Sequence, residues 1–228
     1  MGVRLLSDEG YPEGTKILKQ HRYCQALMRA RHGESVLLNG KGIACPAAAA
    51  AFGFGLLPAG LQTGKGLVGF GIIADEAVGR RMFEAMPHLR PGEIHGLHLF
   101  PLEQATHEPD VVVVEDEVEK LMWISLAYLH ATGGERVQSS TAVLQATCVD
   151  STLIPYLEGQ LNQGFDCYGS RDATDLGSNE TVMDFPAAML PPIVEHLEYL
   201  AQKAIPTSRA KKAWAARNES DVENGEPG

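Results

Sequence analysis

The sequence predicts an α/β fold, or an α+β fold, built on a mixed β-sheet. Short apolar segments bounded by glycine and proline alternate with segments whose apolar residues recur at helical spacing. The chain has 228 residues, of which 44% are hydrophobic, so it can bury a substantial core. The order of elements in the first half also recurs in the second. Together these observations predict one domain, residues 1–205, followed by a disordered tail at residues 206–228.

In the first half, the spacing of Tyr23, Leu27 and Ala30 predicts a helix, which Gly33 is suited to end. Pro87 is expected to end a later helix, because its ring cannot continue one. The expected order is a strand at 3–6, a helix at about 20–31, a strand at 35–38, a helix capped by Cys45, a strand at 67–73, a helix at 75–86 and a strand at 94–100.

The second half is expected to follow the same order. It comprises a strand at 110–115, a helix at 118–130, a strand at 136–139, a helix at 141–156, a strand at 165–170 and helices at 179–189 and 193–204. Two strand-helix-strand-helix repeats, residues 3–101 and 110–204, would then be related by a pseudo-twofold axis. Cys45 and Cys148 would occupy equivalent positions at the seam. The alternative is a chance likeness, because every α/β chain alternates strands and helices.

Composition restricts the classes of function. Nineteen basic against 29 acidic residues give a formal charge of -10, which argues against nucleic acid and anionic membranes as partners. No apolar run approaches the roughly 20 residues that span a bilayer, and residues 1–9 lack the apolar core of a signal peptide. A cytoplasmic location is therefore expected. Four cysteines are too few for a disulfide scaffold in a chain of this length.

Cys45 and Pro46 together indicate the start of a helix. Proline suits the first helical position, because the N–H that it lacks would have no intrahelical acceptor. Cys45 is then the cap residue, where the helix dipole favours a thiolate. The five alanines at residues 47–51 favour helix and leave room for a bound group to approach closely.

The cysteines have no short CxxC spacing, which excludes zinc-ribbon, thioredoxin and ferredoxin signatures. Any site that they share must be assembled by the fold. Four thiolates suit an iron–sulfur cluster or a soft metal. The alternative is that most are buried structural thiols. The cysteines are Cys24, Cys45, Cys148 and Cys167, and the polar neighbours expected to assist a bound cofactor are Arg22, Gln145, Asp150 and Arg171.

Other motifs are missing. The sequence contains no HExxH, and the glycines at 60 and 64 are spaced one residue too closely for a phosphate-binding P-loop. Nucleotide binding is therefore a weak alternative.

Four strings resemble those of the family catalogued as domain of unknown function 169, whose members come largely from archaea and anaerobes. They begin at Arg22, Cys45, Gln145 and Cys167 and read RYCQAL, CPAAAAAFGF, QATCVD and CYGSRDATD. The resemblance runs from about residue 3 to about residue 200 and includes all four cysteines. Family members often carry a further cysteine where this chain has Ser170, and they begin with an additional helix. The resemblance supports a site more than a reaction.

We expect a thiol-lined site that binds a metal or an iron–sulfur cluster in redox or anaerobic metabolism. Cys45 and Cys148 would be the inner ligands or a nucleophile pair, and Cys24 and Cys167 would complete the set. The guanidinium groups would balance the charge of an anion or cluster. One alternative is an enzyme that uses Cys45 as a thiolate on a small molecule, and another is a non-catalytic binding or assembly module. The partner would be a small molecule or redox protein, and homo-oligomers are compatible with the sequence.

Overall fold

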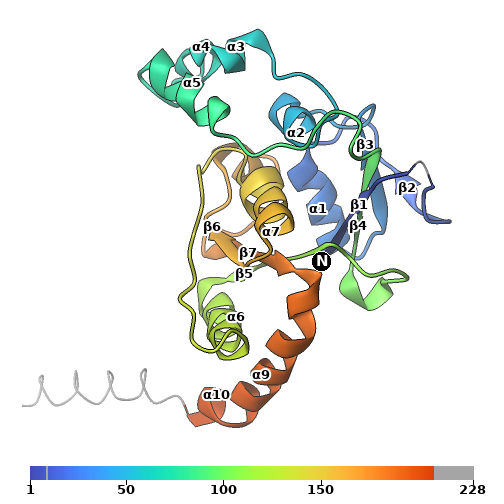
Figure 1. Ribbon diagram of the computed structural model, residues 1–228, viewed down its shortest axis with the longest axis vertical. Helices are drawn as coiled ribbons and strands as arrows, with labels where there is room; N and C mark the ends of the chain where they lie inside the picture. Colours follow the sequence, from blue (N-terminus) through green and yellow to red (C-terminus); the bar gives the residue numbers. More distant parts are fainter. Residues whose placement is uncertain (9, 208–228) are drawn as a thin grey trace, which may run out of the picture.

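A seven-stranded mixed sheet has the strand order β2-β3-β4-β1-β5-β7-β6 (Figure 1). The computed structural model describes residues 1–8 and 10–207. Among the strands of the described residues, β2 and β3 pair in parallel and the other pairs are antiparallel. The expected mixed α/β architecture is therefore confirmed. The strands are β1 (Gly2–Leu6), β2 (Lys16–Ile17), β3 (Val36–Asn39), β4 (Gly96–Phe100), β5 (Val111–Glu117), β6 (Asn162–Gly164) and β7 (Glu180–Pro186).

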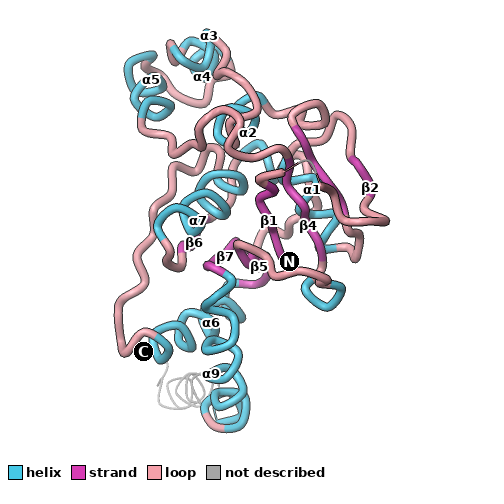
Figure 2. Tube along the Cα trace, turned by 45° about the vertical axis from the view of Figure 1, so that its right-hand side comes forward, coloured by secondary structure: helices cyan, strands magenta, loops and turns pink. Residues whose placement is uncertain are grey.

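Helices lie on both faces of this sheet and at both ends of the molecule (Figure 2). Within the described residues, no helix is long and apolar enough to cross a membrane. The α-helices are α1 (Tyr23–Arg31), α2 (Pro46–Ala51), α3 (Ala59–Gln62), α4 (Lys65–Gly69), α5 (Glu76–Glu84), α6 (Val118–Ala131), α7 (Ile154–Glu158), α8 (Tyr168–Arg171), α9 (Leu190–Gln202) and α10 (Ala204–Thr207). A π-helix, η2 (Ala146–Leu153), leads directly into α7, and the 3-10 helices are η1 (Leu102–Gln104) and η3 (Ala187–Met189).

Strand β5 lies between two hydrophobic cores, and its side chains alternate between them. Val111 and Val113 belong to the core that contains α1 and η2, whereas Val112 and Val114 contact the core formed with α6 and α9. Successive side chains of a strand point to opposite faces, so β5 contributes to both cores at once. Cys148 belongs to the first core, and Cys45 packs against it.

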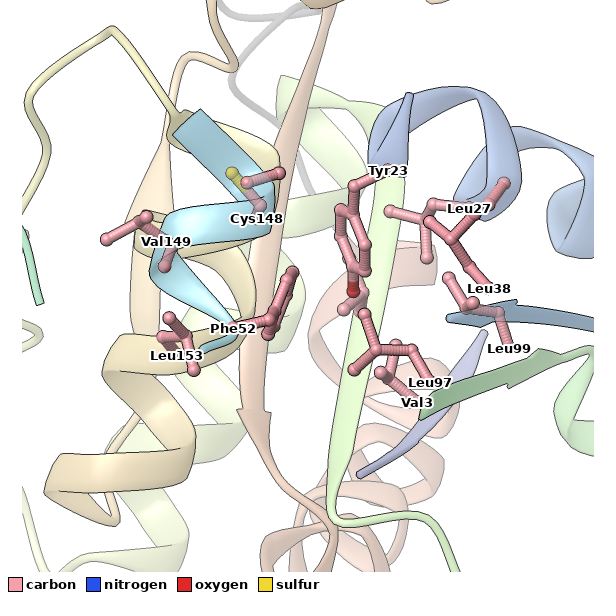
Figure 3. Packing of buried hydrophobic residues seen from close by; sticks show 14 of the residues in the cluster. Val3, Tyr23, Leu27, Leu38, Phe52, Leu97, Leu99, Cys148, Val149 and Leu153 are labelled. Atoms are coloured by element: carbon pink, nitrogen blue, oxygen red, sulfur yellow. The ribbon is translucent and has the colours of Figure 1, made fainter. Parts of the chain in front are cut away.

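Tyr23 and Phe52 fill the centre of the first core. Figure 3 shows these two rings between the segment that carries Cys148 and the sheet residues Leu97 and Leu99. The ring centroids are 5.1 Å apart and the angle between the ring planes is 43°, a tilted geometry with a centroid distance in the range that aromatic pairs prefer. The Tyr23 hydroxyl also pairs with Thr152 Oγ1 at 2.7 Å, which satisfies both buried oxygens. This contact fixes α1 against η2.

Helices α3, α4 and α5 form a lobe that packs mainly within itself. It lies at the opposite end of the molecule from α6 and α9 (Figure 1 and Figure 2). Gly64 has a positive φ of 79°, and a Cβ at this position would lie 2.1 Å from the carbonyl oxygen of Glu76. Glycine therefore allows the close approach of α4 to α5. The strand expected at 67–73 is wrong: these residues form the end of α4 and the turn after it, since a short apolar run does not distinguish helix from strand.

Three further expectations in the second half are wrong. Residues 180–186 of the expected helix 179–189 form strand β7, because pairing with β5 and β6 on both sides decides its conformation. Residues 165–170 contain the start of α8 rather than a strand. Residues 136–139 form no strand, and Ser139 contacts Gln163 through its hydroxyl instead of a backbone ladder. The helix expected at 141–156 begins only at η2.

The remaining expected elements are confirmed, with boundaries shifted by a few residues. The helix expected from residue 20 starts at Tyr23, because Gln20 has a positive φ of 55°. Residues 204–207 form α10, so the first two residues of the tail expected at 206–228 are helical, and the rest of that tail lies outside the described residues.

The predicted internal repeat is not confirmed. The helix capped by Cys45 follows β3, whereas the helix that contains Cys148 precedes β6. Cys45 and Cys148 are therefore not at equivalent points of the two halves. Cys167 caps α8, the helix that follows β6, just as Cys45 caps the helix that follows β3. Cys167 therefore corresponds to Cys45 more closely than Cys148 does.

Glu115 and Asp184 are buried on the sheet face that η2 covers. Glu115 is 6% exposed, Asp184 is fully buried, and neither Glu115 Oε2 nor the two Asp184 oxygens has a hydrogen-bond partner within the described residues. Glu115 Oε2 lies 3.7 Å from an Arg31 nitrogen, an ion pair too long to be a hydrogen bond. Burial raises the pKa of Asp184 well above its ordinary value, which favours the neutral form of this carboxyl.

Replacement of Glu115 by glutamine is predicted to reduce the pH dependence of stability. Burial and, secondarily, Asp166 raise the pKa of Glu115 to about 7 from an ordinary 4.5. The folded state keeps a proton that the unfolded chain releases, so wild-type stability falls as the pH rises through this interval. In thermal unfolding, the free energy of unfolding of Glu115→Gln minus that of wild type should rise between about pH 5 and about pH 8, by on the order of 2 kcal/mol. The exposed control Glu158→Gln should show no such trend, and a pH-independent difference for Glu115→Gln would refute the account.

Candidate functional site

All four cysteines line one cavity of about 700 Å³. They come from four separate segments of the chain: α1, the residue before α2, η2 and the residue before α8. Cys24 and Cys148 are buried, whereas Cys45 and Cys167 are half-buried. The fold therefore assembles a shared thiol-lined surface that no sequence spacing displays.

Helix α1 presents its first turn to this cavity. Arg22 is the cap residue and lines the cavity together with Tyr23, Cys24 and Gln25. The Gln25 side chain accepts a hydrogen bond from the Arg22 backbone N–H at 3.0 Å, and Arg22 Nη1 donates to the carbonyl of Gly169 at 2.9 Å. The second contact joins the start of α1 to α8, next to Cys167.

Helix α2 also presents its first turn to this cavity. Cys45 is its cap residue and Pro46 its first residue, as expected from the sequence. Pro46, Ala47 and Ala48 also line the cavity. Their small side chains leave space beside the Cys45 thiol, because alanine extends no further than Cβ.

Cys148 lies within η2, and all eight residues of this π-helix are buried. The residue before it, Gln145, has a positive φ of 60°, and Cys148 Sγ donates to the Gln145 carbonyl at 3.4 Å. π-Helical segments and left-handed non-glycine residues are uncommon and often occur at functional sites. Asp150 is buried but does not line the cavity, and it accepts hydrogen bonds from the Thr141 hydroxyl and the Ala142 N–H.

Cys167 caps α8, and its sulfur accepts a hydrogen bond from the Ser170 N–H at 3.3 Å. Asp166 precedes it with a positive φ of 63° and is 1% exposed. One Asp166 oxygen accepts a hydrogen bond from the Thr147 hydroxyl of η2, while the other has no partner within the described residues. The segment that carries Cys167 is thereby tied to η2.

Burial keeps three of these thiols protonated. It raises the pKa of Cys24 to about 12, with a smaller opposing effect of the neighbouring Ser170 hydroxyl. Burial also raises the pKa of Cys148 well above its ordinary value, reinforced by the other three thiols. Burial and the neighbouring Asp166 raise the pKa of Cys167, and hydrogen bonds from backbone N–H groups partly offset this rise.

The predicted site residues thus fall into two groups. Arg22 and Gln145 line the cavity with the four cysteines, whereas Asp150 and Arg171 do not. Arg171 instead donates to the carbonyls of Phe165, Gly177 and Glu180, and so holds the loops on either side of α8.

Thr147, Ser170 and the α3–α5 lobe line this cavity but were not predicted from the sequence. Ser170 and Thr147 lie in the strings that surround Cys167 and Cys148, so proximity to a cysteine was a usable signal for both. The lobe has no comparable signal. Within the described residues, no three His, Cys, Asp or Glu side chains are arranged to hold a metal ion.

The thiols are predicted to differ in reactivity toward a small alkylating agent. Cys45 and Cys167 should react first, because Cys24 and Cys148 are buried. The shift of the Cys24 pKa from 9.0 to about 12 alone lowers its thiolate fraction about a thousandfold near neutral pH. Mass spectrometry after timed iodoacetamide pulses would measure each rate, with unfolded protein as the control in which the four rates converge. Equal rates for Cys45 and Cys148 in native protein would contradict this arrangement.

Comparison with known proteins identifies the family. The model of the family DUF169, described as uncharacterised ArCR, matches residues 1–196. Searches of curated proteins and of solved structures found no match. The matched range contains every residue that lines the cavity. The chain therefore belongs to the DUF169 family.

Proposed function

We propose that the protein binds a thiophilic metal centre, such as an iron–sulfur cluster, within the cavity lined by its four cysteines, and that it acts in redox metabolism. The convergence of all four thiols on one cavity carries this proposal. Cysteines used only as small apolar core residues have no reason to gather at a single cavity surface. Four thiolates are the usual ligand set for such clusters.

The protonation state of the thiols is consistent with a ligand role. Burial raises the pKa of Cys24, Cys148 and Cys167, so these groups are poor free nucleophiles at neutral pH. A bound metal deprotonates its thiol ligands, and the displaced protons make its affinity pH-dependent. Metal binding is therefore expected to weaken as the pH falls.

The arrangement favours a cluster over a single ion. One ion requires ligands that converge within about 2.3 Å of it, whereas these four thiols come from four separate segments around a cavity of about 700 Å³. A group with several metal atoms reaches thiols spread more widely around a cavity. Arg22 would offset the negative charge of four thiolates, since it lines the same cavity.

A second candidate is an enzyme whose nucleophile is Cys45. This thiol is half-buried at the start of α2, faces the cavity and is flanked by the small residues Pro46 and Ala47. Rapid modification of Cys45 alone, in a protein that binds no metal, would favour this function over the cluster.

The test is anaerobic reconstitution with iron and sulfide, followed by iron and sulfide analysis. Cys148→Ser and Cys45→Ser should each lower the affinity for the metal centre by at least about tenfold, because even residues outside the ligand shell have effects of that size. The exposed Ser178→Ala variant is the control and should retain the wild-type content. Circular dichroism would establish that each variant is folded. Wild-type iron and sulfide content in both folded cysteine variants would refute the proposal.

A further inference from the structure

The cavity encloses more space than a metal site requires. Its volume is about 700 Å³, whereas one water molecule occupies about 30 Å³ of liquid. Binding sites for small organic molecules enclose about 300–1,000 Å³ and combine an apolar lining with a few polar groups. The volume and the lining of this cavity both match that class of site.

One wall of the cavity is apolar and comes from the α3–α5 lobe. Its lining residues are Leu61, Leu67, Phe70, Ile72 and Phe83. Phe70 is 74% exposed although it faces the cavity, so a ligand that covers this ring would remove apolar surface from water. This wall is suited to an alkyl or aromatic group.

The facing wall offers positive charge and hydrogen bonds. Arg22 has no carboxylate within ion-pair distance in the described part of the chain, and the first turn of α1 contains no acidic residue. A helix N-terminus of this kind attracts anions. Beside it, Ser170 lines the cavity and is only 1% exposed, and its hydroxyl lies next to the Cys24 thiol without a nitrogen or oxygen hydrogen-bond partner within the described residues.

We propose that the cavity binds a small organic carboxylate with an apolar chain. The chain lies against the α3–α5 lobe, and the carboxylate accepts hydrogen bonds from Arg22 and Ser170. Asp172 is the acidic residue among those lining the cavity, but it is exposed, so solvent screens its repulsion. This inference goes beyond the proposed metal centre and does not depend on it.

Calorimetric titration with a homologous series tests the proposal. The probes are butanoate, hexanoate and octanoate, with octylamine as the cationic counterpart of octanoate. Affinity should rise about fourfold per added methylene, the gain expected when each methylene is buried. Octylamine should bind at least about tenfold more weakly than octanoate, since Arg22 favours an anion over a cation.

Two variants locate the ligand. Arg22→Gln should weaken octanoate binding by about tenfold or more, as expected for the loss of a charge-assisted contact, and Phe70→Ala should reduce the gain per methylene. Their matched controls are Arg81→Gln and Phe165→Ala, which change exposed residues that do not line the cavity. Both controls should bind octanoate as wild type does.

Absence of octanoate binding, or octylamine binding as tight as octanoate binding, would overturn the proposal. Equal effects of Phe70→Ala and Phe165→Ala would overturn the assigned position of the chain. These results are separable from those on the metal centre, because the titrations are also done on protein whose iron content has been measured. Octanoate binding by iron-free protein that cannot be reconstituted would refute the metal centre alone, and iron binding without octanoate binding would refute only this inference.

Discussion

The complete burial of the π-helix η2 is the constraint on which the site depends. This segment packs against α1, α2 and the strands β5, β6 and β7. It contains buried hydroxyl and carboxyl groups, and a buried polar group is costly unless it has a hydrogen-bond partner. Two of those partners belong to segments that carry other thiols. Thr152 pairs with Tyr23, the neighbour of Cys24, and Thr147 donates to Asp166, the neighbour of Cys167. Satisfying the polar groups of η2 thus positions three cysteines relative to one another.

The same burial determines the chemistry available to the thiols. A thiol removed from water loses acidity, and this effect dominates at Cys24, Cys148 and Cys167. Buried acids near η2 act in the same direction, because Asp166 opposes ionisation of both Cys167 and Glu115. A cation or a positively charged metal centre would relieve this accumulation of acidic groups. The cavity therefore combines soft ligands, an uncompensated Arg22 and an apolar wall, a combination suited to a bound centre beside an organic ligand.

Sequence reasoning succeeded where local signals agree with tertiary structure. The cap at Cys45 was predictable from Pro46 and the following alanines, and the strands β1, β3, β4 and β5 from their apolar runs. It failed at β7, because residues 181–185 are all buried and show no alternation. The hypothesis of a repeat then imposed a helix there. The four cysteines were identified as candidates, but their common cavity depends on long-range contacts. The wall around Phe70 was not predictable, since a glycine-rich apolar segment does not reveal what it covers.

The central claim is that the four thiols together hold one metal centre. Its most direct test is a visible absorption spectrum, with iron, zinc and sulfide analysis, of wild-type protein purified without oxygen. The account predicts broad absorption from iron–thiolate charge transfer, with iron and sulfide in stoichiometric amounts, and bleaching of this absorption on reduction. A colourless protein that contains neither metal nor sulfide, and that stays so after anaerobic reconstitution, would contradict it.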